Sequence, residues 1–370
     1  KINLNLSFTL IPLGIYVLVT LASAVTSLWP FGSFWGWPSS TNESFISVLC
    51  LSLLFILFLN VLEKKDLSWI FFSFIVSWTL VLIYAILQIF GKFVFPFSFS
   101  KNASFNSVGT VFGIAILTAA VIPLIIFLLI NSKKVKRIFF IFFLMLAVFF
   151  LFLINFYLSW WILMLGSALV IIFGTQKKET FNPKWITLPM FLMAASLLFL
   201  IFRFQISGLP AIAPEVFLKA KTTMDISIKV LKERPILGSG PGTFSYDFSK
   251  FKSQDLNATN FWNTRFENGN SKFLSLLSTI GILGVLALLF FIGLIFLHGI
   301  KFLFKKTKSK ESEENKNYEV LSTGMLSFIT LVTASFFFYN SNLTLDFIYF
   351  VFIAGFITLN TDSKKEFYLK

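Results

Sequence analysis

The chain has 370 residues, of which 56% are hydrophobic and 52 are Phe, and its mean hydropathy is +0.83. This composition excludes an ordinary soluble domain, because apolar stretches of about 20 residues recur and that length crosses a hydrocarbon core of about 30 Å. The formal net charge of +14 would suggest nucleic acid as the partner of a soluble protein. Here most of that charge lies in short loops between apolar stretches, so we expect no nucleic-acid partner.

Ten apolar stretches are predicted to be transmembrane helices. They cover residues 8–28, 44–62, 67–90, 108–130, 138–154, 159–174, 186–202, 273–299, 319–339 and 345–360. The fold class is therefore predicted to be all-α, a polytopic transmembrane helical bundle with membrane lipids as neighbours. Residue 1 is Lys rather than Met, and we expect the sequence to be N-terminally truncated.

Alternate connections between these stretches are rich in Lys and Arg, which predicts the orientation of the bundle. The basic segments are 64–65, 133–137, 177–184, 301–316 and 364–370. The bias predicts a multi-pass protein of the cytoplasmic (inner) membrane with both termini cytoplasmic. It divides the chain into a bundle of about seven spans (1–202), a long extracytoplasmic loop (203–271) and a bundle of about three spans (272–370).

The extracytoplasmic loop is expected to carry an amphipathic helix from Pro214 to Arg234. Proline suits the first turn of a helix, and Pro235 would end this one. Apolar residues recur at helical spacing on one side, namely Phe217, Ala220, Met224, Ile228 and Leu231. Such a helix would lie on the membrane surface or cover the bundle. Residues 244–251 predict a second short helix.

A glycine-rich turn follows this helix, with Gly238, Gly240 and Gly242 at alternate positions. Glycines allow a positive φ and close backbone approach, and successive N–H groups could bind a phosphate oxygen. Short glycine patterns are weak signals, however, and taken alone the pattern favours a turn that merely ends a helix. Both readings stay open at this point.

A second polar group precedes the span 273–299. Arg265 can bind two phosphate oxygens at once, and the positive N-terminal end of the next helix would face the same anion. Asn270 or Ser271 can cap that helix. The alternative is that Arg265 and Glu267 form a solvated ion pair and that Ser271 is only an N-cap.

The order of these elements resembles the O-antigen ligase and O-antigen polymerase superfamily of membrane glycosyltransferases. Residues 235–244 read Pro-x-x-Gly-x-Gly-x-Gly-x-Phe, and the next span opens with Asn270-Ser271, followed after nine residues by Gly281-x-x-Gly284. The family has His where this chain has Asn270. The segment 33–36 is also similar to an outer loop of some members.

The resemblance implies transfer of a glycan from an undecaprenyl-diphosphate carrier to an acceptor hydroxyl, outside the cytoplasmic membrane and without a metal or another cofactor. The acceptor would be a lipid, a protein or a growing glycan, and the resemblance does not separate ligases from polymerases. The diphosphate and glycan are expected to contact the glycine turn and Lys219, Lys221, Arg234, Arg265 and Ser271.

Asn270 leaves three readings of the mechanism open, because an amide is no general base. Asn270 positions the substrate while Glu267 acts as base; or no base is needed, because electrostatic stabilisation of the leaving diphosphate dominates; or the chain binds a glycolipid without turning it over. His298 lies toward the opposite end of the same span and does not replace the family histidine. Near the start of the amphipathic helix, Lys219 and Lys221 stand where the family has Arg.

The rival class is a transporter or flippase of an amphiphilic substrate. Such proteins usually place charged residues or broken helices in mid-membrane, and the predicted spans hold few charges at that depth. Asp346 and Glu319 lie near the ends of their spans, where we expect them to be caps or interfacial groups.

Overall fold

The computed structural model describes residues 2–3, 8–37, 40–177, 182–202, 212, 215–259, 261–305, 313–361 and 366–367. Helices make up most of this part of the chain. They are α1 (Leu10–Val25), α2 (Pro30–Trp35), η1 (Thr41–Glu43), α3 (Phe45–Val61), α4 (Lys64–Ile89), η2 (Ser98–Ser100), α5 (Val111–Asn131), α6 (Lys134–Ile154), α7 (Tyr157–Gln176), η3 (Pro183–Trp185), α8 (Thr187–Phe202), α9 (Ala220–Glu233), α10 (Phe244–Phe251), η4 (Gln254–Ala258), α11 (Lys272–Thr279), α12 (Gly281–Phe304), α13 (Glu313–Ser335) and α14 (Leu343–Asn360). Two-residue strands β1 (Ile2–Asn3) and β2 (Glu366–Phe367) pair antiparallel.

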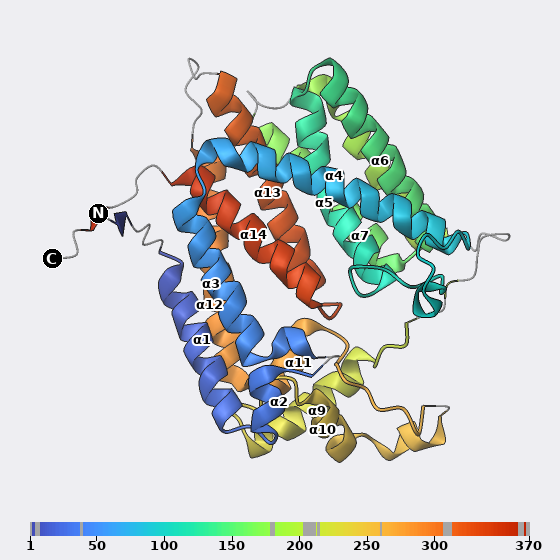
Figure 1. The fold of residues 1–370 in the computed structure, drawn as a ribbon, viewed down its shortest axis with the longest axis vertical. Coiled ribbons are helices and arrows are strands. Elements are labelled where there is room, and N and C mark those ends of the chain that lie inside the picture. The colour runs from blue at the N-terminus through green and yellow to red at the C-terminus, as the bar shows by residue number, and fades with distance from the viewer. Residues whose placement is uncertain are drawn as a thin grey trace.

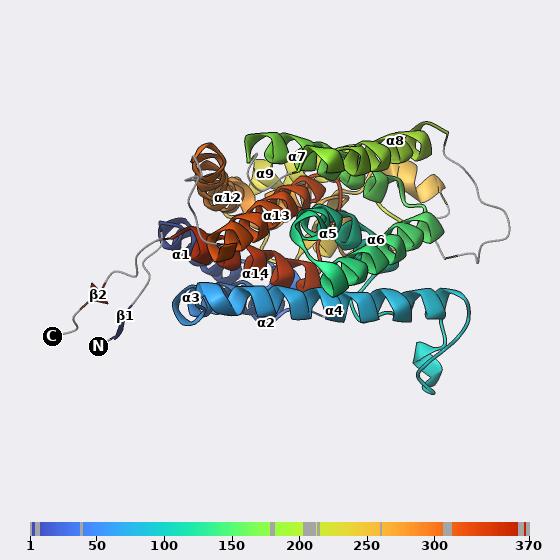
Figure 2. The same ribbon diagram turned by 90° about the horizontal axis from the view of Figure 1, so that it is seen from above.

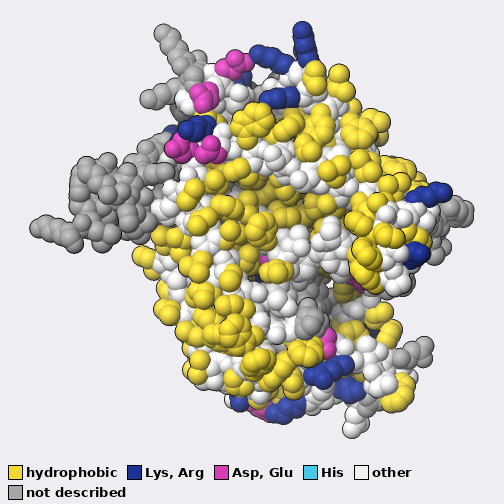
Figure 3. Space-filling model, in the orientation of Figure 1, with side chains coloured by type: hydrophobic (Ala, Val, Ile, Leu, Met, Phe, Trp, Pro, Cys, Tyr) yellow, Lys and Arg dark blue, Asp and Glu magenta, His cyan; other side chains and the backbone are white. Residues whose placement is uncertain are grey.

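Six of these helices are long and apolar enough to cross a membrane, namely α4, α5, α6, α7, α12 and α14. The helices α1, α3 and α8 are apolar but shorter. Apolar side chains cover the middle of the face drawn in Figure 3, and charged side chains lie mainly toward its upper and lower ends and its right edge. The chain is therefore a multi-pass helical membrane protein, as its composition predicts, and each of the ten predicted spans overlaps one or two of these helices.

The centre of the bundle is α5, in which 94% of an 18-residue apolar stretch is buried inside the protein. It packs against α6, α7 and α13, while α14 packs against α3 and α13 (Figures 1 and 2). Close packing of α5 with α7 depends on a small residue. A Cβ atom at Gly166 would lie 2.7 Å from Pro123 Cγ. The helices α2, α9, α10 and α11 gather at one end of the molecule, the lower end in Figure 1.

Two helices of this end differ from the prediction. The span predicted as continuous over 273–299 is divided into α11 and α12, and Gly281, at the break, has φ +68°. A residue with positive φ cannot continue a right-handed helix. The helix predicted from Pro214 begins at Ala220 instead; residues 215–219 are not helical, and Pro214 lies outside the described residues. The short helix predicted at 244–251 is confirmed as α10.

Candidate functional site

A cleft of about 510 Å³ opens where α5 and α14 begin, and is called here the outer cleft. It is lined by two loop segments, 215–218 and 264–269, by the turn before α14, and by residues of η1 and the N-cap of α5. Its lining residues are Thr41, Asn42, Thr110, Glu215, Val216, Phe217, Leu218, Thr264, Arg265, Phe266, Glu267, Asn268, Gly269, Tyr339, Asn340, Ser341, Asn342 and Leu343. Figure 3 shows a hollow in the apolar face in this region. Concave sites are the usual places for small-molecule binding, and most of the residues that line this one are polar or charged.

Arg265 and Glu267, two of the residues singled out from the sequence, both line this cleft. The Arg265 guanidinium donates to Ser245 Oγ at 3.1 Å and lies 5.0 Å from the centre of the Tyr246 ring. Among the described residues no carboxylate pairs with Arg265 or makes a hydrogen bond with it. Its remaining N–H groups are therefore free to bind an anion in the cleft.

Glu215 is a second carboxyl group on the cleft that sequence reasoning missed. Tyr339 Oη donates to Glu215 Oε2 at 2.9 Å, and Thr110 Oγ1 lies 2.8 Å from the same hydroxyl. Burial raises the pKa of Glu215, and these hydrogen bonds oppose the rise. The sequence placed Glu215 in the first turn of a helix, where an acidic residue is ordinary, so nothing marked it.

Asn270 and Ser271 serve the local structure instead of lining the cleft. The backbone N–H of Asn270 donates to Thr223 Oγ1 at 3.0 Å, and its side-chain amide donates to the Leu218 carbonyl at 3.1 Å. Ser271 is the N-cap of α11. Asn270 thus ties the segment before α11 to the start of α9, and its amide nitrogen already has a partner.

The glycine turn lies across the break between α11 and α12. The N–H groups of residues 238–240 donate to the carbonyls of Arg234, Ser278 and Thr279 at 3.2, 2.9 and 2.8 Å. All three glycines have a positive φ, and a Cβ atom at Gly240 would lie 1.9 Å from Ser27 Oγ. In this structure these N–H groups are used by the protein's own backbone and do not face a phosphate.

The other cations proposed from the sequence lie away from the outer cleft. Arg234 Nη1 donates to the Thr26 carbonyl at 2.8 Å. Lys219 is the N-cap residue of α9 and Lys221 lies in its first turn, and both side chains are exposed. Among the described residues, Arg265 is therefore the one basic side chain that lines the cleft.

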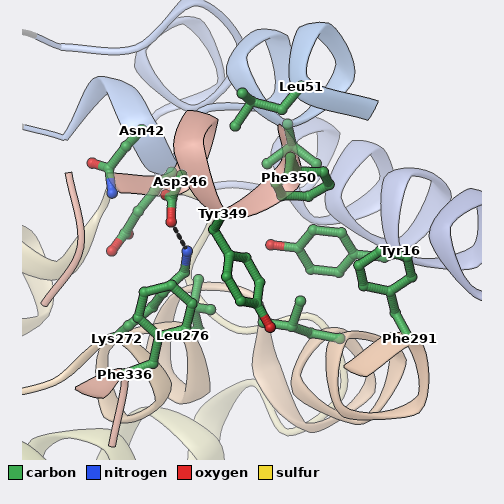
Figure 4. Close-up of a pocket in the computed structure, with 13 residues that line it drawn as sticks. Tyr16, Asn42, Leu51, Lys272, Leu276, Phe291, Phe336, Asp346, Tyr349 and Phe350 are labelled. Atoms are coloured by element: carbon green, nitrogen blue, oxygen red, sulfur yellow. Dashed lines mark hydrogen bonds and ion pairs between the residues drawn. The ribbon is translucent and has the colours of Figure 1, made fainter. Parts of the chain in front are cut away.

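A group of buried charges, called here the charge cluster, lines a second cavity (Figure 4), and Asn42 lines both this cavity and the outer cleft. Lys272 and Asp346 form an ion pair in which both side chains are almost fully buried. Glu43 is also buried, and neither of its carboxyl oxygens has a hydrogen-bond partner of normal geometry among the described residues. All three line one narrow cavity with about 30 Å³ of open space, room for about one water molecule.

The environment of Glu43 sets its proton affinity. Burial raises the pKa of Glu43 to about 7; the charge of Lys272 and the nearby N–H of Gly242 oppose the rise, and Asp346 adds to it. The N–H of Gly242 is close enough to act on this charge although it does not form a well-aligned hydrogen bond. Within the glycine turn, the N–H of Gly242 therefore faces an anion, and this anion is the protein's own Glu43 carboxylate.

Asp346 and Glu319 are more than the helix caps or interfacial groups expected from the sequence. The N-cap of α14 is Asn342, whose side chain accepts from Leu345 N, and Asp346 is paired inside the bundle. Glu319 forms a second largely buried ion pair, 2.7 Å from Lys177. Sequence reasoning placed these residues near span ends but could not show that a lysine from another helix meets each of them.

Comparison with protein-family models gives no match, and comparison with curated proteins finds no relative. Relatives therefore assign no role to any residue of this chain.

Proposed function

We propose that this protein is a membrane glycosyltransferase that transfers a glycan from a polyprenyl-diphosphate carrier to an acceptor hydroxyl. The observation that carries the proposal is Arg265 on the outer cleft, with no carboxylate partner among the described residues. A guanidinium binds diphosphate oxygens through paired N–H groups. The cleft opens beside the apolar surface of the bundle, where the polyprenyl chain of the carrier would remain in lipid. The resemblance to the O-antigen ligase and polymerase superfamily supports the same reaction.

The proposal includes a topology of ten spans. In it, α1, α3, α8 and α13 cross the membrane together with the six longer apolar helices, and residues 203–271 face the outside of the cytoplasmic membrane. The short connections with many lysines then lie in the cytoplasm, as expected for such loops. The outer cleft opens on the side where a polyprenyl-linked glycan is presented for cell-surface polysaccharide biosynthesis.

In the proposed reaction the acceptor oxygen attacks the anomeric carbon of the glycan. The bond between that carbon and the carrier phosphate breaks, and its electron pair leaves with the diphosphate. Arg265 stabilises the charge that develops on this leaving group. Glu267 lines the same cleft and is available to bind another hydroxyl of the glycan or the acceptor, while the proton of the attacking hydroxyl passes to a carboxylate of the protein. No metal is required in this scheme.

Two features favour other candidates. The amide nitrogen of Asn270 is bound to the Leu218 carbonyl, which fits a protein that binds a glycolipid without turning it over. The break between α11 and α12, beside buried charges, fits a transporter of an amphiphile, because transporters build sites at interrupted helices.

The deciding experiment uses the protein reconstituted in liposomes with glycan-loaded undecaprenyl diphosphate, candidate acceptors and EDTA. A transferase releases undecaprenyl diphosphate, and Arg265→Ala lowers kcat/KM by about 100-fold or more. Lys232→Ala, a change of an exposed cation on α9 outside the outer cleft, is the matched control and keeps wild-type activity. Binding of the carrier without release would instead indicate the binding protein, and movement of intact glycolipid between leaflets would indicate the transporter.

A further inference from the structure

The charge cluster contains two carboxyl groups and one ammonium group. Glu43, Lys272 and Asp346 all line the narrow cavity, and no second cation lines it among the described residues. With both carboxyl groups ionised the cluster would carry one excess negative charge away from water. An uncompensated buried charge is costly, so a group in this position takes up a proton or another positive charge.

Glu43 is the member of the cluster that lacks a partner. The Asp346 carboxylate pairs with Lys272 through Oδ1 and accepts from Ser341 through Oδ2 at 3.1 Å. Among the described residues, neither oxygen of Glu43 has a hydrogen-bond partner of normal geometry, although the Gly242 N–H lies nearby, and the residue is 4% exposed.

The other groups that face the cavity are neutral. Among the described residues they are the amide of Asn42 and the phenols of Tyr349 from α14, whose ring Figure 4 shows beside the Lys272–Asp346 pair, and of Tyr16 from α1, which lies farther from the pair. The space has room for about one water molecule, and two carboxyl groups beside an ammonium make a poor metal site. A proton is the positive charge that fits.

Hydrogen bonds connect the cluster to the outer cleft. Asn42 lines both the cavity and the cleft, and its side chain donates to the Ser341 carbonyl at 3.1 Å. Ser341 also lines the cleft, and its hydroxyl donates to Asp346. Ser341 thus links the two sites, because the residue lines the cleft and its hydroxyl donates to a carboxylate of the cluster.

We propose that Glu43, Lys272 and Asp346 bind one exchangeable proton and that, in the transfer reaction, this cluster receives the proton of the acceptor hydroxyl through Ser341. The second half of the proposal rests on the proposed function, and the first half does not. The acceptor proton moves to Ser341 Oγ as the serine passes its own proton to Asp346 Oδ2. The acceptor oxygen then bonds to the anomeric carbon, and the electron pair of the broken bond leaves with the diphosphate.

The charge count explains why the cluster suits this role. One added proton makes the cluster neutral, with Lys272 left to balance the remaining carboxylate. Burial raises the pKa of Glu43 to about 7, so the proton is gained and lost in the neutral range, where proton transfer is most effective in catalysis. Glu43 and Lys272 act through Asp346 and Ser341 and are positioning residues.

The proton site is tested by infrared difference spectroscopy of the purified protein between pH 5 and pH 9. We expect a protonated carboxyl band in the wild type that disappears near neutral pH. The variants are made in an Asp247→Asn background, because Asp247 is another buried carboxyl group whose pKa is raised to about 7 by burial. In that background Glu43→Gln and Asp346→Asn each leave one carboxylate for one ammonium, so each removes the band. The matched control is Glu233→Gln, which changes an exposed carboxylate paired with Lys250 and leaves the band in place. A band that persists in both cluster variants, or no such band in the wild type, would overturn the proton site.

The transfer step is tested with Ser341→Ala in the carrier-release assay. We expect kcat to fall by about 100-fold, with the KM for the carrier and the infrared band unchanged, and Ser341→Thr to restore most of the rate. The wild-type rate should rise with pH through about 7, and this rise should vanish in Glu43→Gln. If Ser341→Ala were fully active while Arg265→Ala was inactive, the proposed proton transfer through Ser341 would be refuted and the proposed transferase function would stand. No release by the wild type would remove the transferase and the relay together, while the infrared band still decides the proton site.

Discussion

Gly238 and Gly281 meet backbone against backbone. A Cβ atom added to either residue would lie 2.7 Å from the backbone nitrogen of the other, and both residues have a positive φ. Around this contact the carbonyls of Pro235 and Ile236 accept the first N–H groups of α12, and residues 239–240 donate to the last carbonyls of α11. The glycine turn therefore supplies the hydrogen bonds that the helix break would otherwise leave unmade, which are costly to lose inside a membrane protein.

We expect Gly281→Ala to destabilise the protein by roughly 2 kcal/mol or more. The alanine would be strained at φ +68°, and its Cβ atom would lie 2.4 Å from the Ile236 carbonyl oxygen. Gly293→Ala in the same helix is the control, because nothing lies within 4 Å of its added Cβ atom. That change should alter stability by no more than about 1 kcal/mol. Thermal unfolding in one detergent compares the two, and equal melting temperatures would contradict the role given to Gly281.

We expect Glu43→Gln to change how stability depends on pH. The folded-state pKa of Glu43 is raised from 4.5 to about 7, so between these values the folded protein holds a proton that the unfolded chain has released. Wild-type stability therefore falls as the pH rises through this window, and the contribution is fully present only below it. The variant lacks this fall and should be more stable than the wild type at pH 8, by roughly 2 kcal/mol. If the melting temperatures of the wild type and the variant changed by the same amount between pH 5 and pH 8, the burial of an unpaired carboxyl group would be contradicted.

We expect Lys272→Met to be among the more damaging single changes outside the apolar core. It leaves Asp346 and Glu43 buried without a cation, and removing one partner of a buried ion pair costs about 3–5 kcal/mol. Adding Asp346→Leu removes one of the two carboxylates that Lys272→Met leaves without a cation. The double variant should therefore recover part of the lost stability. Denaturation of the single and double variants completes a double-mutant cycle, and additive losses would show that the two side chains do not interact.

We expect Arg234 and Arg265 to behave differently. Arg265→Ala should weaken carrier binding, because its guanidinium lines the outer cleft. Arg234→Ala should lower thermal stability slightly, by about 1 kcal/mol, and leave carrier affinity unchanged, because Arg234 is bound to the Thr26 carbonyl outside the cleft. Binding of fluorescent polyprenyl diphosphate to both purified variants separates the two effects. If Arg234→Ala lost more carrier affinity than Arg265→Ala, the result would indicate that the diphosphate binds near the glycine turn.

Local patterns account for most of the helices. Hydrophobic runs of about 20 residues predict where helices lie, whatever those helices pack against, and each of the ten predicted spans overlaps one or two helices. The short helix α10 also has its predicted limits. The helix break at Gly281 was missed because the apolar run continues through it. The decisive feature there is a contact with Gly238, which is remote in the sequence.

The candidate site was predictable only in part. Arg265 and Glu267 stand out because they are charged residues in the loop just before a span, and both line the outer cleft. Asn270 and the glycine turn stood out equally, yet their polar groups are largely bound within the protein. Glu43 and Lys272 gave no signal, because a charged residue at the end of an apolar run is normally solvated.

The sequence by itself determined that this protein is a bundle of membrane helices, because hydrophobicity and charge act residue by residue along the chain. Only the tertiary structure decided which polar groups face the cleft and which are buried together. Lys272 and Asp346 belong to different helices, and Glu43 to a third segment. Their charges and proton affinities depend on distances and burial that arise only when these segments pack.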